Sequence, residues 1–249
     1  MRSGKLKIVC NYPIRVHIYT KSRYIMENQT VSQKRKPKNP IKFQVSLNEE
    51  QKEAKSVVLR NKITVIKGQA GSGKSLVAAQ VALDMLFRRD VEKIILTRPA
   101  VTSGEEIGYL PGDKDAKLAP YVATIFDQMY RLYNKEKIDK EVSEGRIEII
   151  PVGFLRGRNF TNCVVVVDES QNINHRQTEL LLGRMCSGSK MILCGDTAQI
   201  DLKDKKTSGF QFLCANFKDV PGFAVVTLKT NHRDPIVEEI LKIYKEHLD

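Results

Sequence analysis

Short apolar runs alternate with longer amphipathic stretches along most of the chain. The apolar runs predict six β-strands, at residues 63–67, 93–97, 147–151, 163–167, 190–194 and 224–228. Helical periodicity is clearest in four stretches, at residues 74–88, 116–134, 177–186 and 235–247. Strands that lack polar alternation are buried on both faces. This order therefore predicts an α/β fold, a mostly parallel sheet with helices on both faces.

The first 40 residues differ from the rest in charge. Of the net charge of +12, +9 falls on residues 1–40, where Glu27 is the only acid. The stretch 34–40 holds four basic residues and two prolines, which predicts a linker, and 5–19 predicts one or two short strands. We therefore divide the chain into a basic N-terminal segment, 1–40, and a domain, 41–249. The imbalance favours a polyanion such as nucleic acid as partner, and a solvated basic tail is the alternative.

Composition argues against membrane and secreted classes. The apolar runs are far shorter than the roughly 20 residues that cross a bilayer, so no membrane association is predicted. The N-terminus lacks a continuous apolar core and a small-residue cleavage site, so a signal peptide is not expected. The five cysteines are widely spaced and form no Cys/His cluster. We expect buried, reduced thiols in a cytoplasmic protein, and no zinc site.

The segment 68–75 matches the phosphate-binding pattern G-x-x-x-x-G-K-[ST]. It stands between a predicted strand and a predicted helix, which is where backbone N–H groups and a helix N-terminus can surround phosphate oxygens. All eight residues are predicted to hold a nucleoside triphosphate: Gly68, Gln69, Ala70, Gly71, Ser72, Gly73, Lys74 and Ser75. Lys74 is expected to reach the β- and γ-phosphates, and the Ser75 hydroxyl to bind Mg²⁺. A purely structural glycine-rich turn is the alternative.

Two acids follow the fully apolar run 163–167. Ligands bind at the carboxyl ends of parallel strands, so we expect Asp168 to hold Mg²⁺ through its water shell. Glu169 is expected to orient and deprotonate the attacking water. A carboxylate beside the metal favours hydrolysis, because a kinase must exclude water. A kinase for small molecules is therefore the least favoured hypothesis.

A third polar group follows the run 190–194. Asp196 and Gln199 are suited to sensing the γ-phosphate or positioning water, with a turn and helix cap as the alternative. Arginine matches charge spread over phosphoryl oxygens, and the arginines near these motifs are Arg98, Arg156, Arg158 and Arg233. Arg156 and Arg158 stand among glycines and aromatic residues, which suits a loop that contacts a ligand or a nucleic-acid backbone. Arg233 precedes the last predicted helix and is a candidate arginine finger.

Taken together, these segments resemble the PhoH-type ATPase family. The resembling blocks are residues 68–75, 97–101, 104–112, 154–160, 168–172 and 195–201. The run Leu47-Asn48-Glu49-Glu50-Gln51 is also similar to the adenine-reading element of superfamily 1 helicases, which makes Gln51 the expected base contact. The resemblance covers about residues 43–245, and its most specific block is 104–112.

The resemblance implies a RecA-like P-loop NTPase, similar to one helicase motor domain, that hydrolyses ATP with Mg²⁺. It also implies a link to RNA metabolism and a homo-oligomer, with a hexameric ring as the expected form. A helicase motor closes two such domains around ATP, so translocation would need a neighbouring subunit, with Arg233 or Arg156 acting in trans. Some relatives carry an N-terminal nuclease domain, which is not expected in the short, acid-poor segment 1–40.

The leading functional hypothesis is an ATP hydrolase that acts on, or is stimulated by, single-stranded nucleic acid, RNA rather than DNA. The alternative is a regulatory or assembly ATPase whose partner is a protein. In that case the basic segment would be incidental.

Overall fold

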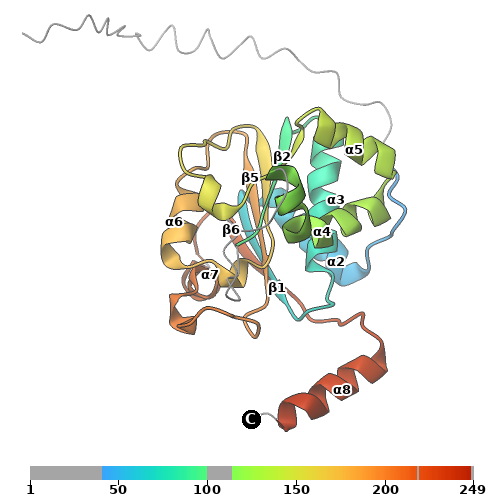
Figure 1. Ribbon diagram of the computed structural model, residues 1–249, viewed down its shortest axis with the longest axis vertical. Helices are drawn as coiled ribbons and strands as arrows, with labels where there is room; N and C mark the ends of the chain where they lie inside the picture. Colours follow the sequence, from blue (N-terminus) through green and yellow to red (C-terminus); the bar gives the residue numbers. More distant parts are fainter. Residues whose placement is uncertain (1–40, 100–113, 218, 248–249) are drawn as a thin grey trace, which may run out of the picture. The chain divides into compact units, whose positions relative to one another are not determined.

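The computed structural model describes residues 41–99, 114–217 and 219–247, and they are organised around one β-sheet (Figure 1). The predicted basic segment 1–40 and the resemblance block 104–112 lie outside the described residues. Their roles, and the boundary predicted between residues 40 and 41, therefore stay predictions. Within the described ranges, no helix is long and apolar enough to cross a membrane.

Six parallel strands form the sheet, in the order β3-β2-β4-β5-β1-β6. Their bounds are β1 Ile63–Gly68, β2 Lys93–Thr97, β3 Ile147–Ile149, β4 Cys163–Val167, β5 Lys190–Gly195 and β6 Phe223–Leu228. All six predicted strands are confirmed. The strand predicted at residues 147–151 is the one that was predicted too long, because β3 ends at Ile149, before Pro151. A proline has no N–H to continue the ladder, and here Pro151 caps the 3₁₀ turn Val152–Phe154.

The four predicted helices are confirmed as α3 Lys74–Phe87, α4 Lys114–Leu132, α6 His175–Leu182 and α8 Pro235–Glu246. Three further helices were not predicted: α2 Glu49–Arg60, α5 Lys135–Ser143 and α7 Gly209–Asn216. Each begins with a polar side chain that accepts a hydrogen bond from the first turn, namely Asn48, Asn134 or Ser208. These caps were the available signal in the sequence for the residue at which each helix begins.

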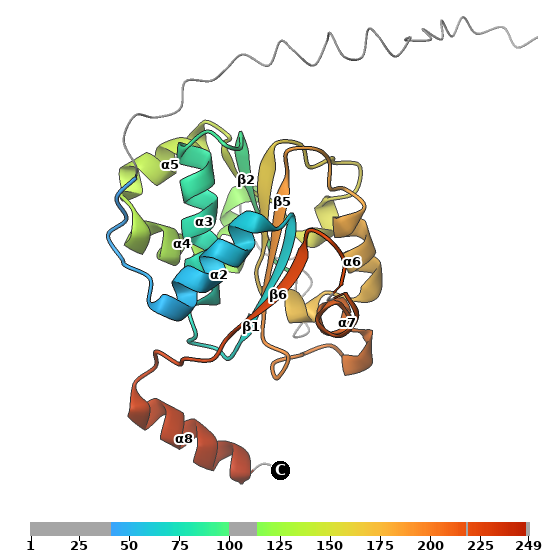
Figure 2. The same ribbon diagram turned by 180° about the vertical axis from the view of Figure 1, so that it is seen from behind.

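Helices cover both faces of the sheet, as predicted (Figures 1 and 2). On one face, α2, α3, α4 and α5 pack on strand residues that include Ile66, Leu96 and Val166. On the other, α6 and α7 pack on the alternate residues, such as Val65 and Val165. Every residue of β4 is buried, which explains why its sequence has no polar alternation.

The described cysteines agree with the predicted reduced thiols. Cys163, Cys186, Cys194 and Cys214 are all free, and Cys163 and Cys194 are buried in the sheet. Burial raises the pKa of the Cys194 thiol well above its ordinary value. Cys10 lies outside the described residues.

The strand order brings the predicted chemistry to one edge of the sheet. β4, β5 and β1 are adjacent and parallel, so their carboxyl ends lie side by side. The chain leaves β1 through α3 and enters β2 on the far side of β4 and β5, which makes this edge a topological switch point.

Candidate nucleotide-binding site

The loop between β1 and α3 requires glycine at two positions. Gly71 and Gly73 have φ of 91° and 87°, in the left-handed region that favours glycine. A Cβ on Gly73 would lie 2.4 Å from Gln51 Nε2, and one on Gly71 would lie 2.7 Å from Asn231 Oδ1. No side chain caps the N-terminus of α3, so its first N–H groups remain available to an anion.

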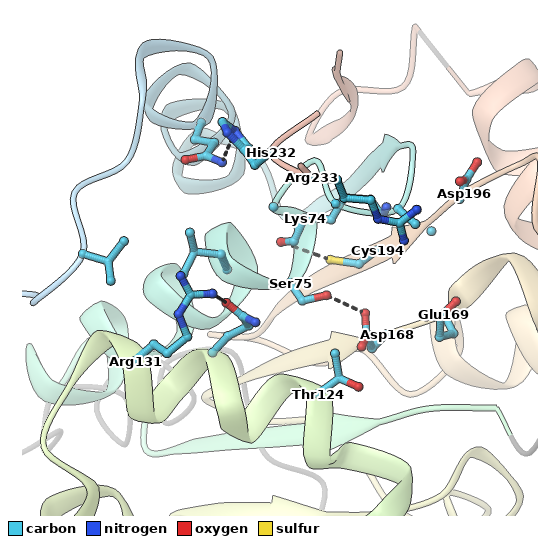
Figure 3. A pocket seen from close by; sticks show the side chains of 18 of the residues that line it. Lys74, Ser75, Thr124, Arg131, Asp168, Glu169, Cys194, Asp196, His232 and Arg233 are labelled. Carbon is cyan, nitrogen blue, oxygen red and sulfur yellow. Dashed lines mark hydrogen bonds between the residues drawn. The ribbon is translucent and has the colours of Figure 1, made fainter. Parts of the chain in front are cut away.

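Lys74 folds back over this loop. Its Nζ donates to the carbonyl oxygens of Gly68, at 2.7 Å, and Gln69, at 2.9 Å. These two bonds hold the ammonium group at the loop, among the residues that line the cleft (Figure 3). A positive charge in this position is suited to phosphate oxygens.

Ser75 and Asp168 form a pair of oxygen ligands that fits Mg²⁺. The Ser75 hydroxyl donates to Asp168 Oδ1 at 3.0 Å (Figure 3). Mg²⁺ prefers such hard oxygen donors and keeps waters and substrate phosphates in its shell, so few protein ligands are needed. Within the described residues, no group of three or more His, Cys, Asp or Glu side chains could hold a metal. The donor set therefore fits a cation shared with phosphates.

Asp168 sits in an unfavourable place for an isolated charge. It is only 8% exposed. Burial raises the pKa of its carboxyl, the neighbouring charge of Glu169 raises it further, and the hydrogen bond from Ser75 opposes both. A bound cation would relieve this penalty, because it would supply the missing opposite charge.

Glu169 has a strained backbone. Its φ of 50° and ψ of 36° lie in the left-handed region, which is rare for a residue other than glycine. Such conformations cost about 1–3 kcal/mol and cluster at functional sites. Gln171 Nε2 donates to Glu169 Oε2 at 2.6 Å, and Arg98 Nη2 lies 3.7 Å from Oε1. The carboxylate is therefore held over the cleft by two neighbours.

Gln171 also connects the ends of β4 and β5. Its side chain is 1% exposed, donates to the Gln199 carbonyl at 3.1 Å and accepts from the Asp196 amide at 3.2 Å. The predicted sensor residues therefore lie beside Glu169, with the Gln199 side chain exposed. Gln171 belongs to the resembling block 168–172, but no role was predicted for it. Its only local signal was an amide two residues after a strand-end acid.

The predicted base contact, Gln51, lies on the other side of the loop at the start of α2. It is 4% exposed, and its Nε2 donates to the Ser72 carbonyl at 3.3 Å. Asn48 and His232 stand next to it, and both were missed as site residues. Their association could not be seen in the sequence, because His232 comes from the segment after β6.

The predicted arginines separate into two groups. Arg233 lines the cleft (Figure 3), beside Gly71 of its own chain. Arg98 pairs with Glu169. Arg158 is bound instead to Glu148, with Nη1 2.9 Å from the carboxylate. Arg156 is exposed and is not among the described residues that line the cleft. Its predicted action in trans stays a prediction.

One face of α4 adds residues that were not predicted to belong to the site. Thr124, Gln128 and Arg131 line the cleft, at the spacing of one helix face, and Arg131 Nη1 donates to Gln128 Oε1 at 3.3 Å (Figure 3). The cleft has a volume of about 730 Å³, which is in the usual range for sites that take small molecules.

Comparisons with known proteins agree with this arrangement. The model of the family described as "PhoH-like protein" matches residues 45–245. A PhoH-like protein from Synechocystis sp. is 38% identical over 190 residues, which cover 76% of this chain and 58% of the relative. A PhoH-like protein from Bacillus subtilis is 35% identical over 196 residues, 78% of this chain and 61% of the relative. The chain thus spans about three fifths of the length of these relatives.

Among solved structures, the large terminase from a thermophilic bacteriophage is similar, with a TM-score of 0.52 and 10% identity. The match covers 80% of this chain and 50% of the terminase chain, and it concerns the fold alone. With the parallel sheet and the loop after β1, it confirms the predicted RecA-like α/β fold.

Proposed function

The chain belongs to the PhoH-like family of P-loop NTPases, and from that premise we propose that it hydrolyses ATP with Mg²⁺. The observation that carries the proposal is the convergence of three strand ends on one cleft. The glycine-rich loop follows β1, Asp168 and Glu169 follow β4, and the turn 196–199 follows β5. This combination provides phosphate binding, oxygen ligands for a cation and a carboxylate able to accept a proton.

In this proposal the residues 68–75 bind the phosphates through backbone N–H groups, and Lys74 contacts the β- and γ-phosphates. Ser75 and Asp168 would hold Mg²⁺, which when bound supplies positive charge to the phosphate oxygens. Glu169 accepts a proton from water at its carboxylate, and Gln171 keeps that carboxylate in place. Gln199 lies at the rim, where it can orient the same water.

We assign Arg233 to phosphate contact within its own chain, because its side chain lies beside Gly71. This replaces action in trans as the leading idea for Arg233. Arg156, which is exposed outside the cleft, is left as the residue that could reach a neighbouring subunit. Completion of the site by a neighbour belongs to the proposal of a homo-oligomer, with a hexameric ring as the form to test.

We further propose that single-stranded nucleic acid, RNA rather than DNA, stimulates the hydrolysis. The net charge of +12 supports a polyanion partner, and most of it lies in residues 1–40. A protein partner is the alternative, and deletion of 1–40 distinguishes the two. Loss of RNA stimulation with intact basal turnover supports the nucleic acid. A cytoplasmic location belongs to the same proposal and is supported by the free thiols.

The test is an ATPase assay with and without single-stranded RNA, run beside a mass measurement in solution. Phosphate release should rise with RNA, and added salt should abolish the rise, because phosphate contacts depend on counterion release. Lys74→Ala is the inactive control. Wild-type protein that releases no phosphate from ATP would overturn the hydrolase proposal. Turnover unaffected by RNA would overturn the nucleic-acid part alone.

A further inference from the structure

Two side-chain amides at the start of α2 fix one another's orientation. Asn48 Oδ1 accepts a hydrogen bond from the Gln51 backbone N–H at 2.8 Å, and Gln51 Oε1 accepts from the Asn48 backbone N–H at 3.2 Å. This capping box uses the oxygen of each amide. The NH₂ group of each amide must therefore point to the other side, so the assignment of nitrogen and oxygen is not arbitrary.

Both NH₂ groups converge on one nitrogen of His232. His232 Nε2 lies 3.0 Å from Asn48 Nδ2 and 3.3 Å from Gln51 Nε2. Two donors require an acceptor, so this network assigns the lone pair to Nε2 and the proton to Nδ1. Gln51 Nε2 donates its second hydrogen to the Ser72 carbonyl. Both N–H bonds of the Gln51 amide are thus used, whereas His232 is exposed.

Backbone hydrogen bonds to the phosphate-binding loop and to α2 hold the segment that carries His232. The His232 backbone N–H donates to the Gly71 carbonyl at 3.1 Å, which ties it to the phosphate-binding loop. The Glu50 carboxylate accepts from the backbone N–H groups of Lys229, at 2.6 Å, and Thr230, at 3.1 Å. These bonds lower the pKa of the Glu50 carboxyl. The position of the imidazole is therefore set by α2 and by the loop together.

His232 and the carboxylates lie on opposite sides of the phosphate-binding loop. Figure 3 shows His232 on one side, Glu169 on the other, and Lys74 and Ser75 between them. If the γ-phosphate points to Glu169, the nucleoside leaves the loop towards α2 and His232. Within the described part of the chain, His232 Nδ1 has no hydrogen-bond partner, so the ring offers one N–H donor and a flat face at that end.

We propose that His232 is a specificity-determining residue that contacts the nucleobase, and that Asn48 and Gln51 position it. The inference rests on the proposed function, since it concerns the same site. Purine rings offer unprotonated ring nitrogens that accept from an N–H donor, and their faces stack on an imidazole. Gln51, predicted from the sequence as the base contact, then acts through His232.

The test compares two ligands, one with and one without a nucleobase, on two proteins, one with and one without the imidazole. Equilibrium binding of a slowly hydrolysed ATP analogue and of inorganic tripolyphosphate is measured for wild type and His232→Ala. Loss of one hydrogen bond and a ring contact should weaken the analogue about tenfold and leave tripolyphosphate within about twofold. His247→Ala is the matched control, because His247 is exposed and its ring forms a hydrogen bond with the Ile243 carbonyl of the preceding helix, away from the cleft residues.

Two further variants separate contact from support. His232→Asn keeps an NH₂ donor at the place of Nδ1, but its amide is too short to reach the place of Nε2, where Asn48 and Gln51 donate. It should therefore recover part of the affinity for the ATP analogue that His232→Ala loses. Gln51→Ala in the His232→Ala background should cause no further loss for the ATP analogue if Gln51 acts through the imidazole. A further loss for the ATP analogue but not for tripolyphosphate would mean that Gln51 contacts the base itself, and it would overturn the positioning role. The tripolyphosphate measurement is needed because Gln51 also donates to the Ser72 carbonyl of the phosphate-binding loop.

Equal weakening of both ligands in His232→Ala would overturn the proposal, because it would show an effect on the phosphate loop through Gly71. Unchanged or tighter binding of the analogue would overturn it as well. Binding is measured without turnover, so the result for the base contact of His232 does not depend on whether the protein hydrolyses ATP. If the protein binds ATP through His232 but does not hydrolyse it, only the hydrolase proposal is overturned.

Discussion

Replacement of Glu169 by glutamine should separate ATP binding from ATP hydrolysis. The substitution keeps the side-chain shape, and Gln171 Nε2 can still donate to the amide oxygen. The group that would accept the proton is lost, and general bases contribute about 10²–10⁴-fold to rates. At about 1.4 kcal/mol per tenfold, the barrier to hydrolysis should rise by about 2.8–5.6 kcal/mol.

The same change should hardly affect folding. The ion pair with Arg98 spans 3.7 Å, and the two side chains are 26% and 33% exposed. Such a pair contributes only about 0–1 kcal/mol to the free energy of unfolding. The strained backbone at residue 169, with φ of 50°, is the same in both proteins, because glutamine tolerates it no better than glutamate.

The assay is single-turnover phosphate release beside equilibrium ATP binding. Glu49→Gln is the control, because Glu49 is exposed on α2 and contacts Lys52 at the surface. We expect ATP affinity within about threefold of wild type, less than 1 kcal/mol in binding free energy, and phosphate release slower by at least about a hundredfold. Normal turnover in Glu169→Gln would refute the role of Glu169 as the base, whatever the ATP affinity.

Three more substitutions test other parts of the site. Gly73→Ala should lower the free energy of unfolding by about 1–3 kcal/mol, because residue 73 has φ of 87°. It should also weaken ATP binding, because the new Cβ would displace the Gln51 amide, whose Nε2 lies 2.4 Å away. The control Gly145→Ala, at φ of 67° with open space around it, should keep ATP binding. Asp168→Asn should raise the melting temperature of the nucleotide-free protein at neutral pH. Burial raises the pKa of the Asp168 carboxyl, so the protonated carboxyl stabilises the fold in acid and this stabilisation is lost as the pH rises. The difference in melting temperature between Asp168→Asn and wild type must therefore shrink on acidification. Gln171→Leu should lower kcat without raising KM for ATP, since Gln171 holds Glu169 and contacts the β5 turn rather than the phosphate loop; a raised KM with unchanged kcat would contradict this.

The strands and the phosphate-binding loop could be predicted because their signals are local. Each of the five residues of β4 is apolar since both faces of a central strand are buried. Glycine at positions 71 and 73 follows from the backbone of the loop itself. The acids after β4 were placed correctly at the sheet edge, because the carboxyl ends of parallel strands share one edge.

Helix α2 was missed for a local reason too. Ten of the 14 residues of α3 are buried, which makes it apolar enough to recognise. By contrast, α2 buries only Gln51, Ala54 and Val58, so its apolar pattern is too sparse for a periodicity argument. Its capping box, formed by Asn48 and Gln51, marked its start more clearly than its hydrophobic residues did.

The sequence alone determined the chemistry of phosphate binding, because one continuous segment carries the loop, the lysine and the start of α3. Tertiary structure decided what surrounds that segment. His232 meets Asn48 across 184 positions of the chain because β6 pairs with β1 and delivers the following segment to the loop. Likewise, Gln171 joins the ends of β4 and β5 only because those strands are neighbours. Contacts of this kind depend on strand order, which no local preference encodes, so the nucleoside end of the cleft could be recognised only in the folded chain.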